Sequence, residues 1–229
     1  MKKILSVLLS VIILLMFQLE IFALNNANGE EYYFKRNENN QIALTFDDGP
    51  HPKYTYEILD VLERYNIKAT FFVIGVNAQN YKDALRAISS RGHEIGNHTF
   101  SHKCIKDKSA QEISDDIRRC KNIIYSICEK NTVVFRPPGG LMPQLSVSDE
   151  DLFRGYNIIH WSIDTEDWAH RSPEKIAGYV LENIKCGDII LMHDYIGKNS
   201  PTPQALELMI PELLERGFEF VTVSELIKN

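Results

Sequence analysis

Residues 41–50 read QIALTFDDGP, in which an apolar run at 42–46 leads directly into Asp47, Asp48 and a Gly-Pro turn. A short apolar run of this kind is typical of a buried strand, and the turn residues that follow end it. Adjacent side chains that leave a strand point to different sides. One carboxylate can therefore bind a metal while the other acts as a base, although a simple turn with aspartate caps fits the same residues.

The same alternation extends along the chain. Short apolar runs separate longer segments with helical periodicity, a pattern that predicts a parallel sheet covered by helices. Seven strands are predicted, at 42–46, 70–74, 94–97, 133–135, 158–161, 189–192 and 218–221. The clearest helices are predicted at 55–65, at 109–128 after a capping box of Ser109 and Glu112, from Ser172 and Pro173 onward, and at 203–216.

Chemically capable side chains follow several of these strands. Asp47 and Asp48 follow the first, His98 the third, Arg136 the fourth, Asp164 the fifth and His193 the sixth. In a barrel of parallel strands, the C-terminal strand ends share one face, where active sites are built. We therefore expect these residues to meet in one pocket.

His98 and His102 form an H-x-x-x-H pair that could offer two imidazoles to one cation, or could be two surface histidines. Together with Asp48 they would make a site with three protein ligands. Such a site leaves positions open for water and substrate, which is typical of a catalytic metal.

The composition restricts the class of partner. The 229 residues are 44% apolar and 24% charged, which is typical of a packed globular protein. Lys and Arg number 25 against 31 Asp and Glu, which gives a formal charge of −6. The chain lacks the basic excess that nucleic-acid backbones select for, so we expect no nucleic-acid partner. We expect one catalytic domain that acts as a monomer.

The N-terminus has the order of a secretory signal. Lys2 and Lys3 precede an apolar run at 4–17, and the small residue Ala23 follows. We interpret residues 1–24 as a signal peptide or an uncleaved N-terminal membrane anchor, 25–40 as a polar leader, and 41–229 as the catalytic domain. The protein is expected to be secreted or held at the cell surface, with membrane contact only through that first segment.

Four cysteines, Cys104, Cys120, Cys128 and Cys186, would allow two disulfides in an exported protein. Cys120 and Cys128 fall in one predicted helix, where eight residues rise about 12 Å. That separation exceeds the roughly 7 Å limit for a disulfide. We expect four free thiols, with Cys104 and Cys186 as the first alternative pair.

Five motifs carry a resemblance to a known family. TFDDGP, HTFSH, RPPGG, DTEDW and LMH, in this order, resemble the motifs of the polysaccharide deacetylase family with the NodB homology domain, carbohydrate esterase family 4. The resemblance extends from about Gln41 to Ile227. It implies a distorted (β/α) barrel with seven or eight strands, in agreement with the predicted strands.

The resemblance also implies roles for individual residues. Asp47 would be the general base and His193 the general acid, with the metal ligands being Asp48, His98 and His102. Five further residues are assigned supporting roles, with Asp164 and Asp167 as alternatives for one of them.

In this scheme Arg136 would orient Asp47, and Asp164 or Asp167 would tune His193. Trp168 would form a wall of the acetyl pocket. The backbone N–H of Gly139 could donate to an oxyanion. The family often has a bulky residue where this chain has Gly139, so the glycan preference stays open.

The implied reaction is removal of N-acetyl groups from a polysaccharide that contains N-acetylglucosamine. A divalent cation, with Zn²⁺ as the first choice and Co²⁺ or another ion as alternatives, would polarise the acetamide carbonyl. Peptidoglycan is the first expected substrate. Chitin oligosaccharides, O-acetyl esters such as those of xylan, and a non-catalytic role as a secreted glycan-binding protein are the alternatives.

Overall fold

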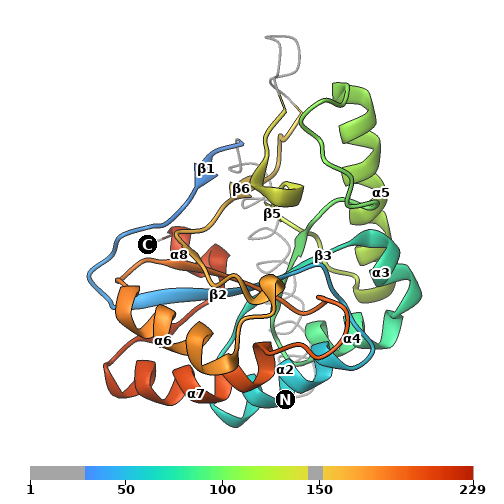
Figure 1. Cartoon of the computed structure of the whole chain (residues 1–229). Helices are drawn as coiled ribbons and strands as arrows, with labels where there is room; N and C mark the ends of the chain where they lie inside the picture. The colour runs from blue at the N-terminus through green and yellow to red at the C-terminus, as the bar shows by residue number, and fades with distance from the viewer. Residues whose placement is uncertain (1–28, 144–151, 229) are drawn as a thin grey trace, which may run out of the picture.

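The computed structural model describes residues 29–143 and 152–228 as a curled, entirely parallel sheet with helices on its outside (Figure 1). The strands follow the order β1-β6-β5-β4-β3-β2-β8-β7, and β9 pairs with the start of β2. Their bounds are β1 Glu31–Tyr32, β2 Gln41–Asp47, β3 Thr70–Val73, β4 Glu94–Asn97, β5 Val134–Phe135, β6 Asn157–Ile159, β7 Ile163–Asp164, β8 Ile189–His193 and β9 Glu219–Phe220.

The connection between β6 and β7 curls this sheet into an incompletely closed barrel. Strands β6 and β7 lie toward opposite ends of the strand order, yet only residues 160–162 separate them in the sequence. Four residue steps span at most about 14 Å. The two ends of the sheet must therefore curl toward each other, which confirms the predicted distorted (β/α) barrel.

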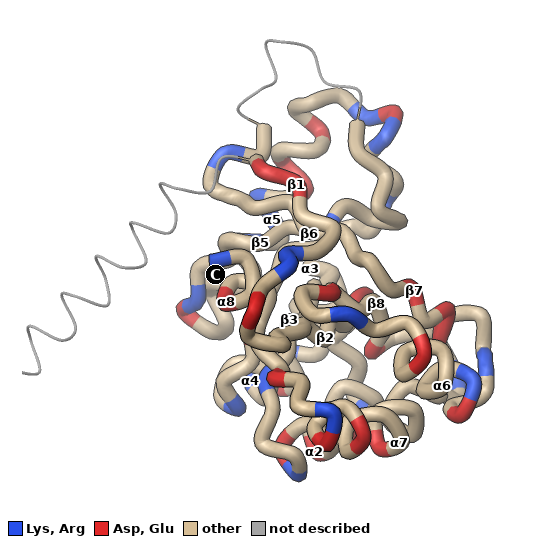
Figure 2. Tube along the Cα trace, turned by 90° about the vertical axis from the view of Figure 1, so that its left-hand side faces the viewer, with Lys and Arg blue, Asp and Glu red and all other residues tan. Residues whose placement is uncertain are grey.

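The helices form an outer layer around the barrel. Their bounds are α2 Tyr54–Arg64, α3 Gly75–Asn80, α4 Lys82–Ser90, α5 Ala110–Cys128, α6 Pro173–Asn183, α7 Thr202–Glu215 and α8 Val223–Lys228, with short 3-10 turns at η1 Pro138–Gly140 and η3 Asp167–Ala169. Helices α6, α7, α2, α4 and α5 pack side by side in that order, and α3 contacts both α4 and α5. Acidic and basic residues are interspersed along these helices (Figure 2).

Strand β2 shows how the core positions the site. Ile42, Leu44 and Phe46 pack in the large apolar cluster shared with the helices, whereas Ala43 belongs to the cluster inside the barrel. Because side chains alternate along a strand, Asp47 lies on the inner side with Ala43. All seven residues of β2 are buried, and Asp47 is the last of them. Its carboxylate therefore lies at the mouth of the barrel interior.

The predicted strands match β2, β3, β4, β5, β6, β8 and β9 to within one or two residues at their ends. Ser109 and Glu112 form the predicted capping box of α5, and Ser172 caps α6 with Pro173 in its first turn. The two-residue strands β1 and β7 and the short helices α3, α4 and α8 were not predicted. Strand β1 lies in the segment expected to be a polar leader.

The four cysteines are free, as predicted. Among the described residues, none of the helices has the length and apolar character needed to cross a membrane. The predicted signal or anchor at 1–24 lies outside the described residues.

Candidate active site

A pocket of about 340 Å³ lies where the C-terminal ends of β2 and β8 meet the loops that follow β4, β5 and β7. Eight of the ten residues that the sequence singled out line it. The full lining is Asp47, Asp48, His98, His102, Gly139, Trp161, Asp164, Trp168, Leu191 and His193. The other two, Arg136 and Asp167, are fully buried and contact lining residues. The predicted convergence on one face is thus observed.

Asp47 and Asp48 face different partners. Asp47 is the last residue of β2, and its side chain is 5% exposed. Asp48 has a left-handed backbone with φ of 74°, which turns its carboxylate toward His98 and His102. The turn after the strand thus gives the two neighbouring carboxylates separate surroundings.

A buried arginine holds Asp47 in place. The Nη1 atom of Arg136 donates to Asp47 Oδ1 at 2.8 Å and to Thr45 Oγ1 at 2.8 Å. Its Nε and Nη2 donate to the backbone carbonyls of Ile159 and His160, at 3.0 and 2.8 Å. A buried charge requires such pairing. One oxygen of Asp47 is therefore fixed, while Oδ2 lies 3.7 Å from His98 Nε2.

Asp48, His98 and His102 could hold a metal ion. One ligand atom from each lies within 4.8 Å of the others. His98 Nδ1 lies 2.8 Å from the carbonyl oxygen of Arg136, so Nδ1 carries the proton and Nε2 is left with its lone pair. The same Nε2 lies 3.5 Å from Asp48 Oδ1, and His102 Nε2 lies 3.0 Å from it.

The donor set fits a divalent cation. Asp48 Oδ1 is buried and has no hydrogen bond of normal geometry with the described residues, although both imidazoles face it. Burial raises the pKa of Asp48, but His102 and His98 together lower it further, so its net pKa lies well below the ordinary value. An anionic oxygen and two imidazole nitrogens facing a pocket match the ligands of an open catalytic site.

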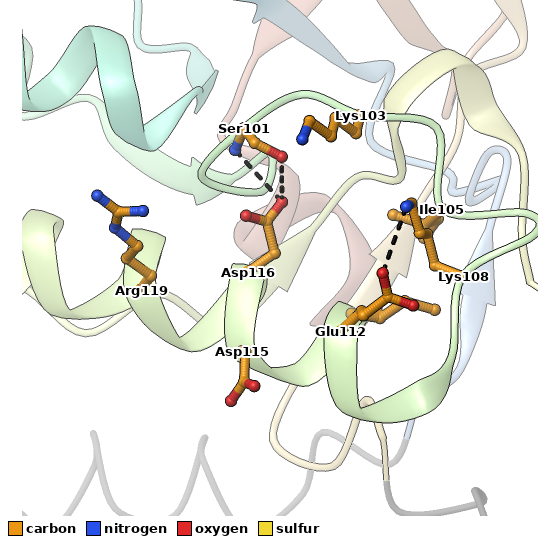
Figure 3. A pocket seen from close by; sticks show the side chains of 9 residues that line it. Ser101, Lys103, Ile105, Lys108, Glu112, Asp115, Asp116 and Arg119 are labelled. Atoms are coloured by element: carbon orange, nitrogen blue, oxygen red, sulfur yellow. Dashed lines mark hydrogen bonds and ion pairs between the residues drawn. The ribbon is translucent and has the colours of Figure 1, made fainter.

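Helix α5 supports the loop that carries His102. The backbone N–H and Oγ of Ser101 donate to Asp116 Oδ2 at 3.3 and 2.9 Å (Figure 3). Asn97 is fully buried and its side chain donates to the carbonyl of Ile117 on α5 at 2.9 Å. Together these bonds hold both ends of the His98–His102 loop against one helix.

Asp167, and not Asp164, pairs with His193. Asp167 Oδ1 lies 2.7 Å from His193 Nδ1, and Oδ2 accepts from the His193 backbone N–H at 2.8 Å and from Thr202 Oγ1 at 2.7 Å. Asp164 lines the pocket and accepts a hydrogen bond from the Glu166 backbone N–H at 2.9 Å. The sequence left these two aspartates as alternatives, and the geometry distinguishes them.

The surroundings of His193 favour its charged form. Burial lowers the pKa of His193, but the hydrogen bond and charge of Asp167 raise it more, with a further contribution from Asp47 and Asp48. The resulting pKa is about 9. His193 is thus an imidazolium at neutral pH with its other nitrogen, Nε2, available to the pocket.

Two tryptophans shape the pocket walls. Trp168 was singled out from the sequence and is 54% exposed at the pocket edge. Trp161 was not. A Cβ on Gly140 would lie 2.7 Å from Cη2 of Trp161, so the ring packs directly on that glycine, whereas a Cβ on Gly139 would meet nothing within 4 Å. The only sequence signal for Trp161 was its place at the end of a predicted strand.

The chain belongs to the polysaccharide deacetylase family, whose model matches residues 34–151. This membership confirms the family resemblance, and the matched range contains the first three of the five motifs.

Among individual proteins, the chain is 41% identical over 189 residues to a peptidoglycan-N-acetylglucosamine deacetylase of Bacillus cereus, and the match covers 82% of this chain and 88% of that protein. It is also similar to the crystal structure of the Bc1960 peptidoglycan N-acetylglucosamine deacetylase in complex with 4-naphthalen-1-yl-N-oxidanyl-benzamide. That comparison has a TM-score of 0.81 at 32% identity and covers 86% of this chain and 92% of that one.

A third similar protein is a family 4 acetyl xylan esterase from Clostridium thermocellum in complex with a cobalt ion. The TM-score is 0.76 at 34% identity, and the match covers 82% of this chain and 90% of that one.

Proposed function

We propose that this protein removes N-acetyl groups from a polysaccharide that contains N-acetylglucosamine, with peptidoglycan as its substrate. One observation carries the proposal: a carboxylate held by arginine, three residues that could hold a metal ion and a histidine paired with a buried aspartate surround one pocket of about 340 Å³. The named activity of the Bacillus cereus relative supports the choice of peptidoglycan.

Asp48, His98 and His102 would hold the cation, and Zn²⁺ is the proposed ion because it accepts two imidazoles and a carboxylate. When bound, a divalent cation polarises a carbonyl and makes water a stronger acid. Asp47 then serves as the general base: Arg136 fixes its Oδ1, and its other oxygen is placed to accept a proton from the attacking water.

His193 supplies the proton for the leaving group. An amide anion is too basic to depart, so the glucosamine nitrogen must be protonated as the C–N bond breaks. Asp167 keeps the imidazole charged and oriented through Nδ1. Asp47 accepts the proton removed from water, and His193 donates the proton that the nitrogen needs. The products are therefore acetate and a free amine.

The remaining lining residues position the acetyl group. The backbone N–H of Gly139 is proposed to donate to the developing oxyanion. Trp168 and Trp161 would form the apolar walls beside it. All of these residues come from one chain, so we infer that a monomer is active, and the sequence at 1–24 leads us to place the enzyme outside the cytoplasm or at the cell surface.

Mass spectrometry of glycan fragments tests the proposed activity. Purified protein loaded with Zn²⁺ should decrease the mass of N-acetylglucosamine residues in peptidoglycan by one acetyl group, with release of acetate. The Asp47→Asn variant is the matched control. Deacetylation of chitin oligosaccharides but not of peptidoglycan would overturn the substrate, and no acetate from any glycan would overturn the activity in favour of a binding protein.

The similarity to an acetyl xylan esterase favours O-deacetylation as the second candidate. An alkoxide or phenolate leaves more readily than an amide anion, so an ester depends less on His193. We expect His193→Ala to lose at least about 10²-fold in kcat on an N-acetylated glycan and to retain most activity on an activated aryl acetate. A wild-type enzyme that hydrolyses acetylated xylan faster than N-acetylated glycans would establish the esterase instead.

A further inference from the structure

Asp194, the residue directly after His193, is a buried acid that the proposed reaction does not use. It is 1% exposed and does not line the catalytic pocket. Its Oδ1 is buried without a hydrogen-bond partner among the described residues. Leaving a buried carboxylate oxygen unpaired costs free energy. A side chain that only filled space here would be more stable if it were apolar.

The contacts of Asp194 lie along the segment 47–55, which begins with Asp47 and Asp48 and ends in the first turn of α2. The backbone N–H of Asp194 donates to the carbonyl of Asp47 at 3.1 Å. Its Oδ2 accepts a short hydrogen bond from Thr55 Oγ1, which in turn accepts from the His51 backbone N–H at 2.7 Å. Asp194 thus connects to the beginning and the end of the segment 47–55.

The middle of the same segment packs on the carboxylate. A Cβ on Gly49 would lie 2.1 Å from both carboxylate oxygens of Asp194. Gly49 does not have a left-handed backbone, so it is the space occupied by Asp194, and not the backbone conformation, that excludes a side chain. The position of the Asp194 carboxylate therefore requires a residue without a side chain at position 49.

The opposite side of the turn is anchored to β3 and α3. Ile74 N–H donates to the carbonyl of Gly49 at 2.9 Å, and the Asn77 side chain donates to the carbonyl of Asp48 at 2.7 Å. Asp194 is the corresponding anchor from β8. The turn is therefore held between the two strands that flank β2.

We propose that Asp194 is a positioning residue that fixes the turn at 47–49 relative to the end of β8. Since His193 is its neighbour, this contact sets the distance from the base Asp47 and the ligand Asp48 to the acid His193. The inference rests on the proposed function for these three roles. Displacing a catalytic group by about 1 Å can cost about 10²-fold in rate.

Two substitutions of Asp194 test whether its oxygen is required as the acceptor of the Thr55 hydrogen bond. Asp194→Ala removes the oxygen that Thr55 contacts, whereas Asp194→Asn keeps an oxygen acceptor and a similar shape. We expect Asp194→Ala to lose about 10²-fold in kcat with KM changed less than about twofold, and Asp194→Asn to stay within about threefold of wild type. An unchanged kcat in Asp194→Ala, or an equal loss in both variants, would overturn the proposal.

Zn²⁺ affinity gives a measurement that does not depend on catalysis. By calorimetric titration of the apoprotein, Asp194→Ala should bind Zn²⁺ about 10-fold more weakly, because Asp48 is no longer held, while Asp194→Asn should bind as wild type does. Thermal unfolding in the absence of metal checks that both variants fold. If the wild type releases no acetate from any glycan, the proposed function fails, yet this titration still decides whether Asp194 positions the turn.

A double-mutant cycle tests the contact with Gly49. Gly49→Ala should lower Zn²⁺ affinity about 10-fold in the wild type, because its Cβ meets the Asp194 carboxylate. In the Asp194→Ala background the same substitution should change affinity less than about twofold, since the obstructing oxygens are gone. Independent effects that multiply in the double variant would contradict a direct coupling of the two residues.

Discussion

At the residue scale, Asp47 and Asp48 are adjacent in sequence and differ in surroundings. Arg136 donates to Asp47 on the inner side of the barrel, whereas Asp48 turns out toward two imidazoles. The sequence predicted this division from the alternation of side chains at a strand end. It could not show the left-handed backbone of Asp48, which produces the division here.

Substitution of these two aspartates should separate proton transfer from metal binding. Asp47→Asn removes the base but leaves the metal ligands, so kcat should fall by about 10²–10⁴-fold while Zn²⁺ stays near one per chain. Asp48→Ala should lose both Zn²⁺ and activity. Elemental analysis with kinetics on the same samples measures the two quantities. Loss of metal from Asp47→Asn alone would mean that the roles are reversed.

The pair of His193 and Asp167 predicts a pH dependence. His193 must be protonated to act as the acid, and its pKa of about 9 keeps it protonated at neutral pH. Activity should therefore fall as pH rises through the pKa of His193. A bound cation places this basic limb below 9, because it opposes the positive imidazolium.

Asp167→Asn removes the charge that raises this pKa and leaves the burial that lowers it. The basic limb of kcat/KM should move to lower pH, in addition to a lower maximum rate. The Asp164→Asn variant is the matched control, because Asp164 contacts the Glu166 backbone and not His193. An unmoved limb in Asp167→Asn would assign the titration to another group.

At the scale of single elements, the long helices were predictable, whereas the strands β1 and β7 and the short helices α3, α4 and α8 were not. Helix α5 carries a capping box and 19 residues of periodic pattern, so local signals suffice. Strands β1 and β7 have two residues each, and they pair with β6 and β8, which come later in the sequence. The equally short β5 and β9 were predicted because each lies within a longer, mainly apolar run, at 133–135 and 218–221.

The candidate site was also predictable only in part from the sequence. Its location followed from the strand ends, because the topology places them on one face. The choice of Asp167 over Asp164 did not, since it depends on the turn η3, which left-handed residues Glu166 and His170 flank. Asp194 was also missed, because an Asp directly after a histidine at a strand end gives no signal that it is buried.

The cysteines differ in burial, and therefore in expected reactivity. Cys120 is fully buried and burial raises its pKa far above the ordinary value, while Cys104 is exposed on the loop before the helix. Thiol titration of the denatured, unreduced protein should find four free thiols. In the native protein Cys104 should react first and Cys120 last. Two or fewer thiols after denaturation would show a disulfide, with Cys104 and Cys186 as the first pair to examine.

At the scale of the whole molecule, Arg136 connects the active site to the closure of the barrel. It leaves β5, reaches Asp47 and Thr45 on β2, and donates to Ile159 and His160, where the chain leaves β6 for β7. Arg136 is fully buried and its guanidinium lies over the ring of Phe72, 4.2 Å from the centroid. The position of the base therefore depends on a side chain that also holds the connection between β6 and β7.

Metal binding should consequently stabilise the whole fold. The ligands come from the end of β2 and from the loop after β4, and the carbonyl of Arg136 orients His98 from β5, so a cation links three parts of the barrel. A ligand that binds only the native state at 100 times its Kd adds about 2.7 kcal/mol to the free energy of unfolding. We expect Zn²⁺ to raise the Tm of the apoprotein by several degrees and a chelator to reverse the increase. The shift should be absent in Asp48→Ala and retained in Asp47→Asn, which keeps all three ligands. An equal shift in Asp48→Ala would place the stabilising ion elsewhere on the molecule and would remove the support for a metal centre in this pocket.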